Sequence, residues 1–275
     1  MLNINKVKKK TKNNEPIGIF DSGVGGLSVL IELERLLPNE NFVFLADQLH
    51  VPYGEKSKNE LIKLAYKITD YFINHHNIKM MVAACNTSTC NSISEVRKKY
   101  LLPIIGTVPA IKPAARRTKT KTIGIIATPS TSKSRVLKKL IGDHCQNINV
   151  FNVGCKNLEN MVEKGELESS EVKKLLTKYL KAIKNSNADY LVLGCTHYPF
   201  LKNAIRKIVG RNIKLINSGR AIAKQTRAFL NKHSLKNSQR KRGESLYFST
   251  GDHIKFTRVA SKLLKHQIKA QKVKL

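Results

Sequence analysis

The chain has 275 residues, of which 50 are Lys or Arg and 19 are Asp or Glu, so its formal net charge is +31. Hydrophobic residues at 41% and charged residues at 25% are ordinary for globular proteins and exclude a chain that is disordered throughout. No apolar run approaches the roughly 18 residues of a membrane helix, and the N-terminus lacks the apolar core of a signal peptide. We therefore expect a cytoplasmic protein of one large or two modest domains, with no membrane partner.

Short apolar runs alternate with amphipathic segments along most of the chain. Residues 1–14 are rich in Lys and Asn and predict a flexible basic tail. The predicted strands that follow are 16–21, 41–46, 79–84, 103–106, 122–127, 148–153 and 190–194. The predicted helices start at residue 27, cover 58–75, start near 134, and cover 172–186. This alternation predicts parallel sheets with helices on both faces.

The order of strand, cysteine and helix occurs twice, at Cys85 and at Cys195. The repeat predicts two similar α/β halves. Ligands of such sheets bind beyond the carboxyl ends of the strands. Four polar clusters follow these ends: Asp21-Ser22-Gly23, Pro52-Tyr53-Gly54, Cys85-Asn86-Thr87 and Cys195-Thr196-His197-Tyr198.

The odd number of cysteines, five, argues against a disulfide framework. We interpret Cys90, Cys145 and Cys155 as structural thiols, since free cysteine packs as a small hydrophobic residue. Cys85 and Cys195 are candidates for chemistry because each lies between a buried strand and a predicted helix. A helix N-terminus lowers the pKa of a thiol from its usual value of about 8.5, and its free amides bind carboxylates.

Several polar residues keep alternative interpretations at this stage. Residues 22–26 are glycine-rich but match neither a phosphate loop nor a dinucleotide fingerprint, so we expect an anion-binding turn. Asp21 is a helix cap, or it orients an ammonium or a thiol. His197 is a hydrogen-bonded core histidine, or it supports Cys195 in acid/base chemistry. A zinc site of Cys85, Cys90, Cys195 and His197 is disfavoured, because Cys90 lies more than one helical turn beyond Cys85, and we expect no metal.

The strongly basic composition has two interpretations. A pI near 10.1 suggests nucleic-acid binding. The excess is mostly Lys and is spread over the whole chain, which favours compositional drift on solvated faces. We therefore do not expect specific nucleic-acid binding, and a basic nucleic-acid-associated protein of the same fold is the competing hypothesis.

Three segments carry a resemblance to a known family. They are Gly18-Ile-Phe-Asp-Ser-Gly-Val-Gly-Gly-Leu-Ser-Val29, Val82-Ala-Ala-Cys-Asn-Thr-Ser88 and Leu193-Gly-Cys-Thr-His-Tyr-Pro199. Together they resemble glutamate racemases, of the cofactor-independent aspartate/glutamate racemase superfamily, from about residue 16 to about residue 258. Residues 106–114 and the lysine-rich N-terminal extension are similar to the enterobacterial branch of that family.

The resemblance implies an α/β fold of two pseudo-symmetric, doubly wound parallel-sheet domains with the active site in the cleft between them. The first domain would comprise residues 15–108 plus 224–275, and the second residues 109–223. The implied activity is the interconversion of L- and D-glutamate by two cysteines without a cofactor, supplying D-glutamate for peptidoglycan. The branch resemblance also implies activation by a muropeptide precursor, whereas the oligomeric state stays undetermined.

The resemblance also assigns roles to individual residues. Cys85 and Cys195 match the catalytic cysteines, with Cys85 acting on D-glutamate and Cys195 on L-glutamate. Asp21, His197 and Glu163 match supporting catalytic residues. The substrate-binding positions are Asp21, Ser22, Tyr53, Gly54, Asn86, Thr87, Thr196 and His197. Asn217 departs from a usual Asp, which bears on local hydrogen bonding or domain packing more than on catalysis.

Two thiols suit racemisation because the proton leaves one face of Cα and returns to the other, which one base cannot easily do. No pyridoxal site is visible in the sequence, so the enolate-like transition state would need amides and hydroxyls as donors. We expect Asn86, Thr87, Thr196 and Ser22 to provide them. Aspartate is the nearest rival substrate.

Overall fold

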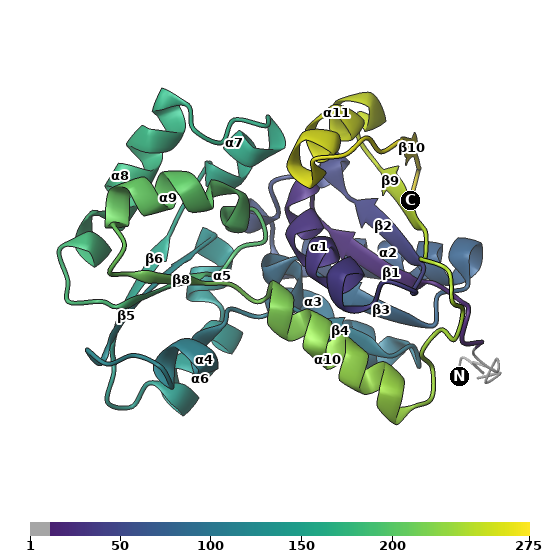
Figure 1. The fold of residues 1–275 in the computed structure, drawn as a ribbon, viewed down its shortest axis with the longest axis horizontal. Helices are drawn as coiled ribbons and strands as arrows, with labels where there is room; N and C mark the ends of the chain where they lie inside the picture. Colours follow the sequence, from purple (N-terminus) through teal and green to yellow (C-terminus); the bar gives the residue numbers. More distant parts are fainter. Residues whose placement is uncertain (1–11) are drawn as a thin grey trace.

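The computed structural model describes residues 12–275 as two lobes, each built on a parallel sheet (Figure 1). Most of the predicted tail, residues 1–11, lies outside the described residues. Residues 12–14 are exposed, and the carbonyl of Asn13 accepts a hydrogen bond of 2.7 Å from the Lys79 Nζ. No helix within residues 12–275 combines the length and the apolar character needed to cross a bilayer.

The first sheet has six parallel strands in the order β10-β9-β2-β1-β3-β4. They are β1 (Ile17–Asp21), β2 (Phe42–Ala46), β3 (Met80–Ala83), β4 (Ile104–Gly106), β9 (Ser245–Ser249) and β10 (Ala270–Lys272). The helices of this lobe are α1 (Leu27–Leu36), α2 (Lys58–His76), α3 (Asn86–Lys99), α10 (Gly219–Lys232) and α11 (His253–Leu264). Three short 3₁₀ turns complete it: η1 (Val24–Gly26), η2 (Gln48–His50) and η3 (Tyr53–Glu55).

The second sheet repeats the topology of the first with four parallel strands in the order β6-β5-β7-β8. They are β5 (Thr122–Ala127), β6 (Asn149–Gly154), β7 (Tyr190–Leu193) and β8 (Lys214–Ile216). Its helices are α4 (Ile111–Ala115), α5 (Pro129–Lys133), α6 (Arg135–His144), α7 (Leu158–Glu163), α8 (Ser170–Lys184), the 3₁₀ turn η4 (Tyr198–Leu201) and α9 (Lys202–Val209). Because the order matches β2-β1-β3-β4, the ends of β3 and β7 are equivalent positions. The predicted α/β architecture of two parallel sheets is confirmed.

Local sequence explains most of these elements. Strands β1, β2, β3, β5 and β7 are apolar runs buried along their whole length, as expected where helices cover both faces of a sheet. Ser57 and Glu60 form a capping box at the start of α2, and Ser134 and Ser169 cap α6 and α8. The sequence analysis missed β8, β9 and β10, which are short or partly exposed.

Two features connect the lobes. One buried cluster contains residues of both, among them Leu27 of α1 and Met161 of α7, so the core is continuous across the interface. The chain returns to the first lobe through α10, which packs on α1 (Figure 1).

Asn217 Oδ1 accepts a hydrogen bond of 2.9 Å from the Gly219 amide at the start of this helix. An asparagine oxygen therefore makes the local hydrogen bond that an aspartate would make. The predicted boundary at residue 224 falls inside α10.

Candidate active site

Polar residues that follow strands of both lobes meet at one narrow cavity. Its walls are formed by Ser22, Val51, Pro52, Tyr53, Gly54, Cys85, Asn86, Thr87, Thr128, Glu159, Cys195, Thr196 and His197. Both candidate thiols and all but one of the predicted substrate-binding residues are in this set. The exception, Asp21, lies fully buried behind the wall, and Glu163 also lies outside it.

Cys85 is the N-cap residue of α3, where its Sγ accepts a hydrogen bond of 3.5 Å from the Ser88 amide. Its Sγ also lies 3.9 Å from the Ser22 Oγ. Burial nevertheless raises the pKa of this thiol, and the neighbouring Asp21 raises it further. The expectation that a helix N-terminus lowers this pKa is therefore wrong, because desolvation of the thiolate outweighs one amide hydrogen bond.

Cys195 lies at the equivalent strand end but has different surroundings. A 3₁₀ turn follows it, and the α-helix begins only at Lys202, so this thiol does not cap an α-helix as expected. Its Sγ lies 3.5 Å from the His197 Nδ1. Burial raises the pKa of Cys195 above its usual value, and the hydrogen bond and charge of His197 offset only part of this rise. Of the two thiols, Cys195 is therefore the one whose thiolate has a cationic partner.

Glu163 contacts the ring nitrogen of His197 that points away from Cys195. Its Oε1 lies 2.7 Å from the His197 Nε2 and accepts a hydrogen bond of 2.7 Å from the Val24 amide, while Oε2 accepts one of 2.5 Å from Gln48. Burial lowers the pKa of His197, but its hydrogen bonds to Cys195 and Glu163 outweigh burial and raise this pKa well above its usual value. The geometry favours a charged imidazole that supports Cys195 over an inert core histidine.

Asp21 connects the two lobes from behind the cavity. Its Oδ1 accepts a hydrogen bond of 3.1 Å from the Thr196 hydroxyl, and its Oδ2 one of 3.2 Å from the Gly23 amide. Burial raises its pKa, although the charge of His197 opposes this. Asp21 therefore orients Thr196, a predicted substrate-binding residue.

The glycine-rich segment, residues 22–26, lets the two lobes approach each other closely. A Cβ on Gly23 would lie 1.8 Å from the Glu163 Oε1, and one on Gly25 would lie 2.4 Å from the His197 Nδ1. Side chains at these positions would push the second lobe away. The expected anion-binding turn does bind a negatively charged group, because the Val24 amide donates a hydrogen bond to the Glu163 carboxylate of this same chain.

The remaining predicted residues are held by hydrogen bonds. Asn86 donates to the Thr107 carbonyl at 3.3 Å, and the Thr87 hydroxyl lies 2.9 Å from that of Thr128. Tyr53 donates to Asp47 at 2.5 Å. Burial and the Asp47 charge raise the pKa of Tyr53 well above its usual range, so it stays a neutral donor.

The sequence analysis missed four residues of this arrangement: Asp47, Gln48, Thr128 and Glu159. Asp47 and Thr128 directly follow strands β2 and β5, a position that could have identified them. No local pattern distinguishes Gln48 or Glu159.

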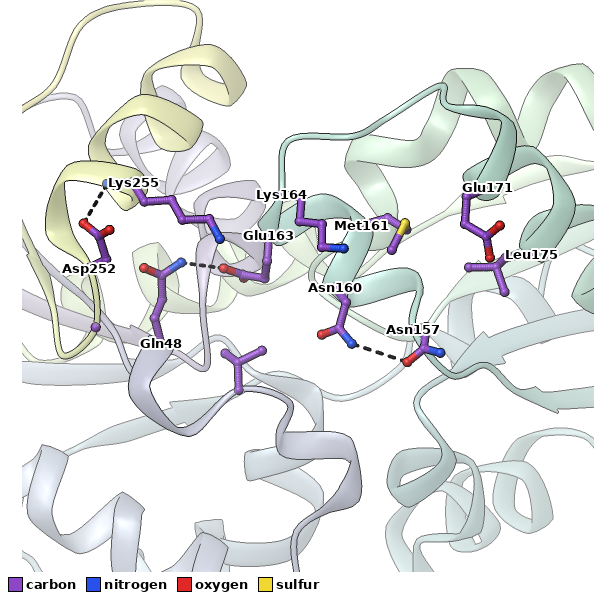
Figure 2. Close-up of a pocket in the computed structure, with 12 residues that line it drawn as sticks. Gln48, Asn157, Asn160, Met161, Glu163, Lys164, Glu171, Leu175, Asp252 and Lys255 are labelled. Atoms are coloured by element: carbon purple, nitrogen blue, oxygen red, sulfur yellow. Dashed lines mark hydrogen bonds between the residues drawn. The ribbon is translucent and has the colours of Figure 1, made fainter.

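A groove of about 560 Å³ lies beside the cavity, between the lobes (Figure 2). Figure 2 shows Gln48 and Glu163 of its wall joined by a hydrogen bond, with Lys255 near Gln48 and Lys164 near Glu163. Val51 lines both the groove and the cavity, and Glu163 in the groove wall contacts His197 in the cavity wall. Within residues 12–275, no group of three or more His, Cys, Asp or Glu side chains is arranged to hold a metal ion.

Two thiols at equivalent strand ends, one on each lobe and facing one cavity, are the arrangement of a two-base isomerase. The sequence model of the family described as Asp/Glu/Hydantoin racemase matches residues 31–226, and the chain belongs to this family.

Glutamate racemases are similar to this chain over nearly its whole length. A glutamate racemase of Herpetosiphon aurantiacus is 37% identical over 246 residues, which are 90% of this chain and 96% of the relative. The glutamate racemase of Francisella tularensis, solved in complex with D-glutamate, has a TM-score of 0.82 at 30% identity and covers 95% of this chain and 98% of its own. The Escherichia coli enzyme, solved with L-glutamate and the activator UDP-MurNAc-ala, has a TM-score of 0.82 at 28% identity and covers 94% and 98%.

These findings confirm the resemblance to glutamate racemases. The relatives come from diverse bacteria, so the narrower prediction of the enterobacterial branch stays a prediction.

Proposed function

We propose that this protein interconverts L- and D-glutamate by a two-cysteine mechanism without a cofactor. The observation that carries the proposal is the pair of buried thiols, Cys85 and Cys195, on the wall of one cavity. The full-length similarity to glutamate racemases supports glutamate as the substrate.

The surroundings of the thiols support an unequal starting state, with Cys195 as thiolate beside the charged His197 and Cys85 as thiol. Cys195 then removes the α-proton of L-glutamate, and Cys85 delivers its own proton to the opposite face of Cα. This leaves D-glutamate with a Cys85 thiolate and a Cys195 thiol, the pair that runs the reverse reaction. The direction of proton transfer follows the family resemblance.

The negative charge that develops on the α-carboxylate needs preorganised donors in a site that excludes water. Asn86, Thr87, Ser22 and Thr196 line the cavity and are our candidates. Tyr53 and Gly54 form another part of the wall and complete the substrate-binding set. Asp21 and Glu163 act through Thr196 and His197, respectively.

We further propose that the product supplies D-glutamate for peptidoglycan and that the protein works in the cytoplasm, where reducing conditions keep both thiols free. The complex of the Escherichia coli relative supports a muropeptide precursor as activator of this chain. Specific nucleic-acid binding is not part of the proposal.

The purified full chain tests the proposal. Circular dichroism should follow racemisation of L- and D-glutamate, and in D₂O the product of each direction should carry α-deuterium. L- and D-aspartate serve as the comparison. Turnover of aspartate with no turnover of glutamate would replace our substrate with its rival, and UDP-MurNAc-ala added to the glutamate assay tests activation.

A further inference from the structure

Glu159 is a buried carboxyl group for which the mechanism above has no use. It lies on α7 and is 6% exposed. Within residues 12–275 its Oε2 has no hydrogen-bond partner. Leaving a buried polar atom without a hydrogen bond destabilises the folded state, so native proteins seldom do so without a reason.

The position of Glu159 supplies a reason, because the side chain lines the same cavity as both thiols. A Cβ on Gly54 would lie 3.0 Å from the Thr128 Cβ and 3.6 Å from the Glu159 Oε1. Glu159 therefore belongs to a corner of the cavity made by Gly54 of the first lobe and Thr128 of the second. Among the described residues of the cavity wall, it has the buried side-chain oxygen that lacks a partner.

We propose that Glu159 determines substrate specificity by donating a hydrogen bond from its carboxyl group to the side-chain carboxylate of the substrate. The inference rests on the proposed function, in which Cα lies between Cys85 and Cys195. The side chain of glutamate must then extend from the thiols along the cavity wall, and its terminal carboxylate needs a donor there. Glu159 lies on that wall with an unpartnered oxygen, and in its protonated form it donates a hydrogen bond from that position.

The surroundings of Glu159 favour that proton. Burial raises its pKa, and the negative charges of Glu55 on η3 and Glu163 on its own helix act in the same direction, whereas His197 opposes them. The other titratable groups that interact with it are Cys195, Cys155 and Tyr198. Two facing carboxylates cannot both be charged at low cost, so substrate binding itself favours a shared proton.

A structural role makes different predictions. Glu159 is the second residue of α7, and its carboxylate interacts with its own backbone amide. If it only stabilised the helix start, its removal would lower the unfolding temperature and leave the pH dependence of KM unchanged.

The test compares the full-length chain with Glu159→Gln, Glu159→Val and, as a matched control, Glu171→Gln, whose side chain is exposed in the neighbouring groove. KM and kcat for L- and D-glutamate are measured from about pH 6 to about pH 10, a range that brackets a raised carboxyl pKa. Unfolding temperatures confirm that each variant folds, and the isosteric glutamine keeps the test valid should valine fail. The KM values of the variants are compared with that of the unaltered chain at the same pH. The other titratable groups are the same in every protein, so their ionisation does not affect this comparison.

In the unaltered chain, KM should rise with pH as Glu159 loses its proton and its charge opposes the substrate. Glu159→Gln keeps a donor, so its KM should match the low-pH value and lack that rise. Glu159→Val should raise KM roughly tenfold at low pH, the effect of about 1.4 kcal/mol from one lost hydrogen bond to a charged group. Glu171→Gln should follow the unaltered chain. Infrared spectra should show a protonated carboxyl band that glutamate shifts and that Glu159→Gln lacks.

Equal KM profiles for all four proteins would overturn the inference and leave the proposed function intact. Absence of glutamate racemisation by the unaltered chain would instead overturn the proposed function, and the inference with it.

Discussion

Replacing Glu163 by glutamine is the most informative test of how the two lobes build the catalytic pair. The carboxylate accepts hydrogen bonds from Val24 and Gln48 of the first lobe and contacts His197 of the second. Glutamine keeps the shape but removes the charge. The Gln48 amide can turn over to accept from the new amide group, so we expect the fold to survive.

The size of the effect follows from the lost charge. A hydrogen bond to a charged group contributes about 1.5–3 kcal/mol, against about 0.5–1.5 kcal/mol for a neutral one. The difference of about 1–2 kcal/mol corresponds to a loss of roughly 5- to 30-fold in kcat, if it is felt in the transition state. Because Glu163 raises the pKa of His197, its loss lowers that pKa. His197 is charged only below its pKa, so the alkaline fall in activity should move to lower pH.

Circular dichroism across the pH range, in both directions of racemisation, provides the measurement. Glu166→Gln is the control, because Glu166 lies just beyond α7 and is exposed, and its carboxylate accepts a hydrogen bond from the nearby Ser169. A Glu163→Gln variant with unchanged kcat and an unchanged alkaline limb would refute the role of Glu163 in charging His197.

Three further predictions can be checked independently. Cys85→Ala and Cys195→Ala should each abolish racemisation in both directions, since both directions need both thiols, whereas Cys90→Ala should stay near the unaltered rate; near-normal activity in either of the first two would exclude the two-base mechanism. Glu40→Ala should lower the free energy of unfolding by about 3–5 kcal/mol in a urea titration, because it leaves the fully buried Lys79 without its carboxylate; an unchanged midpoint would contradict this. Exhaustive dialysis against a chelator, with no pyridoxal phosphate added, should leave activity intact, and a loss restored by zinc would contradict the cofactor-free mechanism.

Much of the fold could be predicted from the sequence because its signals are local. The buried strands are short apolar runs, and the helices begin at Ser57, Ser134 and Ser169, whose side chains satisfy free amides within the same few residues. The two cysteines could be singled out because each follows such a strand directly. Strands β8 to β10 carry no comparable signal, since they are short or partly exposed and depend on pairing with strands distant in the chain.

The electrostatics of the candidate site could not be predicted in the same way. Local reasoning predicted lowered pKa values for both thiols, whereas burial by both lobes raises them. Besides their local partners, His197 and Asp21 each contact a residue from a remote segment: His197 contacts Glu163 at 2.7 Å, and Asp21 accepts a hydrogen bond of 3.1 Å from Thr196. Sequence alone therefore determined the buried strands and placed two thiols directly after two of them, because those features depend on neighbouring residues. Only the tertiary structure decided which thiol faces a charged imidazole and which carboxyl group lies unpaired in the cavity, because burial and long-range contacts arise when the two lobes pack.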